Sequence, residues 1–415
     1  MTKSGKQRQT TQSTNDTISD TGVVRETPQL EEGDFQSAFG ESLSKALDLN
    51  TWGPGEDLIS LYSRLEQEIS DATKQEDRLR DRIRHEIYPR LKTRPDAPKQ
   101  AGIYQASPHD IERVHKGLLF NGTVEACDGT CVAHDTLPIT IVQIGVCLVS
   151  YSGDQGAWVQ RLFRRDLRVG GLDPIEETLE ILERRRKRAD VDVTTKRDSL
   201  SELARRGIMS YAERAVLLEK STAPWRLGHG HPAPYELMTG SGMAELLDKS
   251  IELLSRLILD HKKFLFVPST SKRWLLTLGN ALRPLEYAII DSAESDLRRL
   301  IDQGHYTGEW KTVLPKVKQF VSDAGSKTIV GAYRASAIAP PQLFYAHEDY
   351  VHEAALIAIA DSALQEHRGF PMLIDLADTV CRATFGSESL MAPIQQAYTD
   401  AGEPLSYQSE RSTRR

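Results

Sequence analysis

The feature that most constrains the fold is a long β-branched segment between Pro138 and Tyr151. It is rich in Ile and Val, which favour extended backbone. The apolar approach at residues 123–128 predicts a strand that ends at Asp128, and the segment from Ala157 to Arg168 predicts a third strand. Three successive strands joined by short links favour an antiparallel meander.

Asp128 is followed at once by Gly129 and Thr130, and this pattern has two interpretations. An Asp-Gly pair is common in hairpin turns. A carboxylate at the end of a strand, beside a buried neighbouring strand, is also where a metal-dependent nuclease places its first ligand. Spacing alone leaves both interpretations open.

Downstream of this region, short apolar strands alternate with amphipathic helices. The expected strands are 225–227, 263–268, 286–291 and 328–333, and the expected helices are 211–220, 243–261, 350–367 and 372–385. This alternation predicts an α/β fold in which helices cover a mixed sheet.

The remaining chain divides by composition into further segments. Residues 1–34 are polar and predict a disordered tail, and 401–415 predict a flexible C-terminal tail. Residues 35–100 predict a helical arm, with a short helix at 35–50 and a long one at 56–91. The narrow apolar stripe of the long helix favours either a coiled-coil arm or a helix laid across the domain. A main domain is expected at 105–400, with a charged helical insertion at 172–206.

Composition limits the partners and the compartment. The net charge is -7 over 415 residues, so any DNA binding must use local basic patches. The four cysteines are few and irregularly placed, which fits a reducing cytoplasm. Cys127, Cys131 and His134 have no second cysteine pair to complete a zinc set. The polar N-terminus has no apolar signal-peptide core, and no apolar run reaches the ~18 residues of a membrane span. We therefore expect a cytoplasmic protein without a membrane partner.

Three further side chains are candidates for chemistry. Glu213 lies on a predicted helix, and His229 follows a short strand between two glycines. Asp378 lies three residues after Asp375 on a predicted helix, so the two share a face. Taken singly, each could be a helix cap, a surface acid or a hydrogen-bonded loop histidine. Their order along the chain is the informative feature.

In that order, the segments resemble the motifs of the NurA nuclease family. Cys127-Asp128-Gly129-Thr130 matches the family's opening Asp-Gly-Ser/Thr motif. Glu213 matches its helical Glu, and Leu227–Gly230 occupies the place of its second Asp motif. Gly369–Asp378 matches its closing Gly-aromatic-Pro turn and helix. The resemblance covers roughly residues 110–400.

The resemblance implies an RNase H-like core and a DNA nuclease dependent on Mn²⁺ or Mg²⁺. Asp128, Glu213 and Asp378 would bind the metal, and His229 would be a further ligand or would orient water. It also implies action on single-stranded DNA or duplex ends, a homodimer or larger oligomer, and a hexameric HerA-type ATPase as partner in DNA end processing or antiviral defence.

Two positions depart from the family pattern. This chain has His229 where the family has Asp, and Asp378 where the family has His. The exchange either keeps the same ligand types in swapped positions or marks an inactive adaptor that binds the ATPase or DNA. An RNase H-like enzyme acting on RNA is a further alternative.

Basic side chains after two strands are candidates for binding DNA phosphates. Lys272 and Arg273 follow the strand 263–268, with Trp274 as a possible base-stacking residue, and Arg334 follows the strand 328–333. No Gly-Lys-Ser/Thr phosphate loop is present in the sequence, so we expect no ATP hydrolysis by this chain itself.

Overall fold

The computed structural model describes residues 32–52, 58–135, 140–164, 175, 176, 179, 182, 202–269, 273–302 and 310–405. Most of the predicted N-terminal tail, most of the charged insertion, and Lys272 lie outside the described residues. The chain divides into two compact units, Met1–Asp81 and Arg82–Arg415.

The described part of the first unit is helical. The single short helix expected at 35–50 is instead two helices, α1 (Glu32–Phe39) and α2 (Leu43–Leu47). They separate at Gly40, whose φ of 73° is costly for residues with a Cβ. The long helix is confirmed as α3 (Leu58–Glu86), which begins in this unit and ends in the second.

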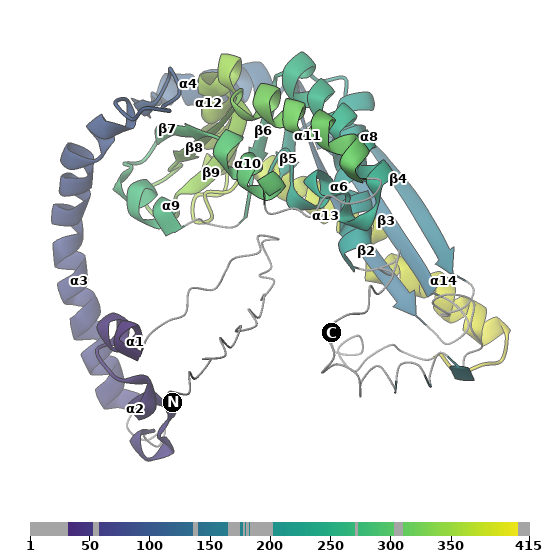
Figure 1. The fold of residues 1–415 in the computed structure, drawn as a ribbon, viewed down its shortest axis with the longest axis horizontal. Helices are drawn as coiled ribbons and strands as arrows, with labels where there is room; N and C mark the ends of the chain where they lie inside the picture. Colours follow the sequence, from purple (N-terminus) through teal and green to yellow (C-terminus); the bar gives the residue numbers. More distant parts are fainter. Residues whose placement is uncertain are drawn as a thin grey trace, which may run out of the picture. The chain divides into compact units, whose positions relative to one another are not determined.

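The second unit contains one mixed sheet of nine described strands in the order β1-β7-β8-β9-β6-β5-β2-β3-β4 (Figure 1). The strands are β1 (Gly102–Gln105), β2 (Val124–Asp135), β3 (Thr140–Ser150), β4 (Gly153–Arg164), β5 (Trp225–His229), β6 (Phe264–Val267), β7 (Glu286–Ser292), β8 (Thr328–Tyr333) and β9 (Gln342–His347).

The direction of the strands confirms the predicted fold class. β2, β3 and β4 form an antiparallel meander, and β5 and β6 continue the sheet parallel to β2. Three antiparallel strands followed by two strands parallel to the first are the arrangement of an RNase H-like core. β9, β8, β7 and β1 extend the sheet from β6 by antiparallel pairing.

The described α-helices that begin and end in this unit, other than isolated residues between 165 and 201, pack around the sheet. They are α4 (Pro108–Val114), α6 (Glu202–Glu219), α7 (Tyr235–Met238), α8 (Ala244–Ser255), α9 (Arg273–Leu278), α10 (Glu294–Asp302), α11 (Trp310–Gly325), α12 (Val351–Ala363), α13 (Met372–Phe385) and α14 (Ser387–Asp400). No helix among the described residues is long and apolar enough to cross a membrane.

Two apolar cores lie on the two faces of the sheet. Buried residues of α6, α8, α10 and α11 form one core with strand residues such as Cys127 and Phe266. Buried residues of α4, α12 and α13 form the other with Ala126 and Leu227. Adjacent strand residues such as Ala126 and Cys127 enter opposite cores because side chains alternate along a strand.

Several element boundaries differ from the sequence predictions. β2 continues seven residues past Asp128 to Asp135, so Asp128-Gly129 is neither a turn nor a strand end. His229 is the last residue of β5 rather than part of a loop. α6 begins at Glu202, nine residues earlier than the helix expected at 211. β1 and β9 were not predicted, because both are short and have weak periodicity.

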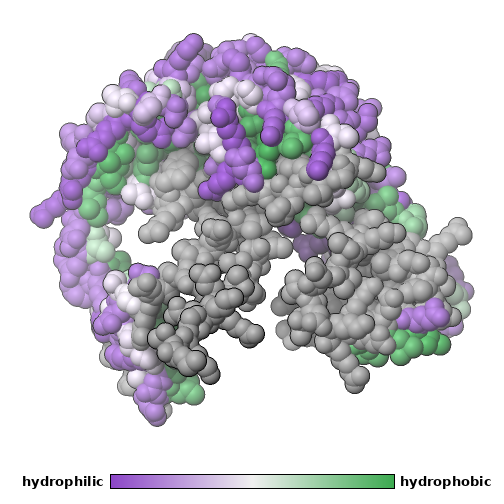
Figure 2. Space-filling view, in the orientation of Figure 1, coloured by the Kyte–Doolittle hydropathy of each residue, from purple (hydrophilic) through white to green (hydrophobic). Residues whose placement is uncertain are grey.

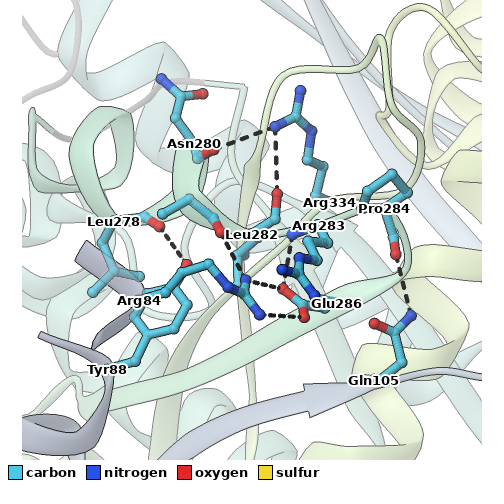
Figure 3. A network of polar contacts seen from close by, with 11 residues as sticks. Arg84, Tyr88, Gln105, Leu278, Asn280, Leu282, Arg283, Pro284, Glu286 and Arg334 are labelled. Carbon is cyan, nitrogen blue, oxygen red and sulfur yellow. Dashed lines mark hydrogen bonds and ion pairs between the residues drawn. The ribbon is translucent and has the colours of Figure 1, made fainter. Parts of the chain in front are cut away.

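An ion pair anchors the C-terminal end of α3 within the second unit (Figure 3). Arg84 donates to both carboxylate oxygens of Glu286 at the start of β7, at 2.6 and 2.9 Å. The Glu286 side chain is 7% exposed. The bidentate geometry and the burial make this contact stronger than a surface ion pair. Tyr88 donates to the carbonyl of Leu278 beside it.

Candidate functional site

The candidate site begins where β2 separates from β5. Their last paired residues are Cys127 and Gly228, and the next residues are Asp128 and His229. Beyond this point the described pairing of β2 continues only with β3, on its other side, where Asp128 faces Cys147. Asp128 and His229 therefore lie side by side at the point where two parallel strands diverge.

The direction of the Asp128 side chain follows from its neighbours in the sheet. Cys147, its partner on β3, packs against Cys381 of α13. Directly paired residues point to the same face. Asp128 therefore lies on the face covered by α13, and only 7% of it is exposed.

Glu213 approaches from the opposite face of the sheet. It belongs to α6, and its Oε1 would lie 2.6 Å from a Cβ placed on Gly129. Gly129 has no side chain, so the Glu213 carboxylate can rest directly against the backbone of β2. Asp128 on one face of β2 and Glu213 against Gly129 on the other face therefore lie at consecutive positions of the strand.

Burial raises the pKa of both carboxyl groups. For Asp128 the pKa rises to about 7, because desolvation outweighs the hydrogen bond from the Gly129 N–H, and the nearby charge of Asp378 adds to the rise. For Glu213 it also rises to about 7, chiefly through desolvation and further through Asp128. A nearby positive charge therefore stabilises the ionised form of each acid.

Arg214 supplies one such charge and also organises the site. Its side chain is 3% exposed and donates to the Glu213 carboxylate at 2.5 Å. It stacks over the ring of Phe266, 5.2 Å from the centroid. Its remaining hydrogen bonds reach the carbonyls of Ser210, His229, His231 and Pro232. Arg214 therefore ties α6 to the segment after β5, a role that sequence reasoning missed.

His229 lies among these charges in a largely apolar setting. Desolvation lowers the pKa of His229, although Glu213 and Asp378 act in the opposite direction. A neutral imidazole is the form that can bind a metal or accept a proton. The ring meets Phe370 edge-on, with the centroids 5.9 Å apart. Phe370 belongs to the turn that leads into α13.

α13 brings Asp378 to the site. The helix is fixed at its start by buried Asp361, which accepts from the Leu373 N–H at 3.0 Å. Asp378 is partly exposed and accepts from Nε of Arg382 at 2.7 Å. Asp375, which shares its face, accepts instead from Gln365 and Arg368.

The four predicted residues are thus brought together, but their side chains do not form a metal cage. Within the described residues, no group of three His, Cys, Asp or Glu side chains is arranged to hold a metal ion. Glu213 is turned to Arg214 and Asp378 to Arg382. The donor types nevertheless fit a hard divalent cation, which would neutralise the buried acids.

A cleft of about 810 Å³ runs along β2 beside these residues. Its lining combines Gly129–Val132 of β2 with the start of α6, the end of α13 and the start of α14. Its charged residues are three arginines, Arg205, Arg206 and Arg382, and three acids, Glu202, Asp378 and Glu388. The Arg206 Nε is buried, and it has no hydrogen-bond partner among the described residues. Guanidinium groups suit phosphate recognition. Sequence reasoning missed these arginines because no motif surrounds them.

The predicted DNA-binding residues lie elsewhere. Arg334 donates to the carbonyls of Asn280 and Leu282, as Figure 3 shows, and to those of Ser336 and Ala337. These bonds give Arg334 a structural role. Lys272 lies outside the described residues, as does the side chain of Arg273, the first residue of α9. Phosphate binding by the three stays a prediction.

Comparisons with known proteins find distant structural similarity. No family model matches the sequence, and no curated protein matches it. The NurA nuclease from Sulfolobus solfataricus is 10% identical, with a TM-score of 0.41 over 81% of this chain and 98% of that one. A NurA structure with manganese is 8% identical, with a TM-score of 0.35 over 70% and 95%. Endonuclease V from Ciona intestinalis, in complex with DNA, is 10% identical, with a TM-score of 0.26 over 77% and 97%.

Proposed function

We propose that this chain is a metal-dependent nuclease that hydrolyses phosphodiester bonds in DNA. The observation that carries the proposal is the meeting of Asp128 and Glu213 on β2, beside His229 and Asp378. Two buried acids whose pKa values are both raised by burial, and further by the charge of a neighbouring carboxylate, are a typical signature of a functional site. The adjoining cleft supplies arginines for a polyanionic substrate.

The proposed metal ligands are Asp128, Glu213 and Asp378, with Mn²⁺ or Mg²⁺ as the ion. Carboxylate oxygens with one imidazole suit Mn²⁺ well. The ion would supply an activated water and charge neutralisation for the phosphorane-like transition state. Asp128 lies on the sheet and would be the rigid ligand. Neutral His229 would complete the ligand set or accept a proton from water.

Replacing Asp128 tests this assignment. Asp128→Asn keeps the size of the side chain but removes the charge, so we expect cleavage of a labelled single-stranded oligonucleotide to fall by at least about a hundredfold. Calorimetry should show weaker Mn²⁺ binding. Asp378→Asn should behave similarly, whereas the matched control Asp375→Asn should keep activity because Asp375 bonds Arg368 and Gln365. Full activity of Asp128→Asn would contradict the assignment.

A catalytically inactive adaptor is the second candidate. The observation that favours it is the pairing of Glu213 with Arg214, since a buried guanidinium can neutralise the acid without a metal. In that case Mn²⁺ titration should give no heat at millimolar concentrations, and no DNA substrate should be cut. DNA or the ATPase would still bind.

The partners belong to the same proposal. We infer single-stranded DNA or duplex ends as substrate, a HerA-type hexameric ATPase as partner, and a homodimer or larger oligomer. DNA end processing or antiviral defence in the cytoplasm would be the setting. The support is the ordered resemblance of the motifs around Asp128, Glu213, His229 and Asp378. Co-purification of the chain with such an ATPase, and stimulation of cleavage by it, would test the partnership.

A further inference from the structure

α3 carries an apolar seam on its described residues. The seam positions are separated alternately by three and four residues, and all but Glu76 are apolar: Tyr62, Leu65, Ile69, Ala72, Glu76 and Leu79. Tyr62, Leu65, Ile69 and Leu79 are 58%, 49%, 53% and 51% exposed. Hydrophobic colour interrupts the hydrophilic surface along this helix in Figure 2.

The spacing of the seam indicates the kind of partner. An average repeat of 3.5 residues keeps the apolar positions facing a second helix in a left-handed coiled coil. An isolated amphipathic helix that buried its stripe on a globular surface would follow a period of 3.6 and a wider stripe. The partner is therefore a helix with the same repeat.

Glu76 decides the relative direction of two such helices. In a parallel pair, equivalent positions meet, so the two Glu76 side chains would face each other in the seam. In an antiparallel pair, Ile69 lies opposite the partner's Leu79, and Glu76 lies opposite the partner's Ala72. The small Ala72 leaves Glu76 room to reach water or its i,i+4 partner Arg80, which it contacts at 2.6 Å.

The flanking charges favour the same direction. In the antiparallel register, Glu66 lies opposite Arg80 of the second copy, and Glu68 opposite Arg82. Because the arrangement has twofold symmetry, each contact occurs twice. In the parallel register, Glu68 would meet Thr73, and Arg80 would meet Gln75, so these opposite-charge pairs are lost.

We propose that α3 pairs with α3 of a second copy of this chain in an antiparallel coiled coil. The helix is about 43 Å long, which is enough for three heptads. Ile69 and Leu79 of both helices are then covered, and the acidic first half of each helix lies against the basic second half of the other. The proposal is independent of nuclease activity, because it concerns only the association of two chains.

Oligomeric state is the first test. We expect the full chain to sediment as a dimer at about 10 µM. Ile69→Lys places a charge in two seam layers, so the dimer dissociation constant should rise by at least about tenfold. The matched control Gln67→Lys adds the same charge on the opposite side of α3 and should leave the dimer intact. A monomeric native chain, or a dimer unchanged by Ile69→Lys, would overturn the proposal.

Direction is tested by cross-linking. Thr73 lies near the twofold axis of an antiparallel pair, so Thr73→Cys should form a covalent dimer under mild oxidation. Leu65→Cys should not, since its counterpart in the second copy is far away. The native chain, with its four cysteines, measures the background. Cross-linking of Leu65→Cys but not Thr73→Cys would show a parallel pair and contradict the proposed direction.

A charge exchange gives an independent test of register. Glu66→Arg and Arg80→Glu should each weaken the dimer severalfold, because each places like charges opposite one another twice. The double variant should recover the native dissociation constant. Additive weakening in the double variant would argue against this pairing.

Discussion

At the scale of single residues, the site depends on how two buried acids are compensated. Asp128 has the Gly129 N–H at 2.9 Å, and Glu213 has the guanidinium of Arg214. These two hydrogen-bond donors do not fully offset the effect of desolvation on the carboxylates. The pKa of each acid still rises to about 7. A divalent cation would stabilise both ionised forms, so metal binding should release protons near neutral pH.

The raised pKa of Asp128 predicts how stability depends on pH. The folded chain keeps a proton that the unfolded chain loses near pH 4, so this contribution to stability is present below pH 4 and disappears as pH rises through about 7. Without metal, the native thermal midpoint should fall between about pH 5 and pH 8.

Asp128→Asn removes this titration. Its thermal midpoint should fall less over the same range, and at about pH 8 the variant should be more stable than the native chain. Glu213 continues to titrate in both proteins, so only the difference between them is diagnostic. Parallel midpoint curves for the two proteins would show that Asp128 is ionised throughout.

At the scale of elements, two glycines set how closely the helices approach the sheet. Gly129 admits Glu213 and Met209 of α6 to one face of β2, and Gly145 admits the ring of Phe385 of α13 to the other face of β3. Neither glycine has a positive φ, so the need at both is for space rather than for an unusual backbone. The helices that carry Glu213 and Asp378 are held in place partly by these close contacts.

Gly129→Ala tests this packing without changing any proposed ligand. The added methyl group would lie 2.6 Å from Glu213 Oε1 and 2.9 Å from Met209, so the carboxylate must move. We expect Mn²⁺ affinity and cleavage rate to fall by at least about tenfold, with a loss of stability of about 1–3 kcal/mol.

Gly117→Ala is the matched control, because a Cβ there meets nothing within 4 Å. Urea unfolding would establish that both variants are folded, and calorimetry would measure the metal affinity. If Gly129→Ala bound Mn²⁺ as tightly as the native chain, Glu213 would not be a metal ligand.

At the scale of the whole molecule, the negative net charge opposes non-specific binding to DNA. The net charge is -7, so attraction must come from the cleft along β2, where Arg205, Arg206 and Arg382 gather. These side chains come from α6 and α13, which cover opposite faces of the sheet. This group of arginines therefore exists only when the complete domain is folded.

This local patch predicts a modest salt dependence for binding of single-stranded DNA. Three phosphate contacts give a slope of about -2 in a plot of the logarithm of affinity against the logarithm of salt concentration. Arg205→Ala should remove one phosphate contact and so make the slope less steep by about 0.7. Fluorescence anisotropy with Ca²⁺ in place of Mn²⁺ would limit cleavage during the measurement.

An unchanged slope in Arg205→Ala would place the DNA outside the cleft. Arg334→Ala provides the comparison, since Arg334 bonds four backbone carbonyls and was predicted from sequence to bind phosphate. A larger loss of slope in Arg334→Ala would favour that earlier prediction over the cleft.

Much of the fold could be predicted from local pattern. β8 (Thr328–Tyr333) and α13 (Met372–Phe385) have the predicted bounds, and the meander and the flanking helices were also expected. Apolar periodicity determines these elements because each must turn one face or stripe towards a core. The four candidate residues Asp128, Glu213, His229 and Asp378 could be ordered along the chain, but their geometry could not.

The sequence by itself therefore determined the class of the fold, several of its strands and helices, such as β8 and α13, and which acids are candidates. Only the tertiary structure decided that Asp128 lies within a continuous strand, where β2 separates from β5. It also decided that Arg214 pairs with Glu213 and that Arg205 and Arg382 share a cleft. The reason is physical: burial, charge pairing and clefts depend on contacts between residues far apart in the chain, and local periodicity carries no information about those contacts.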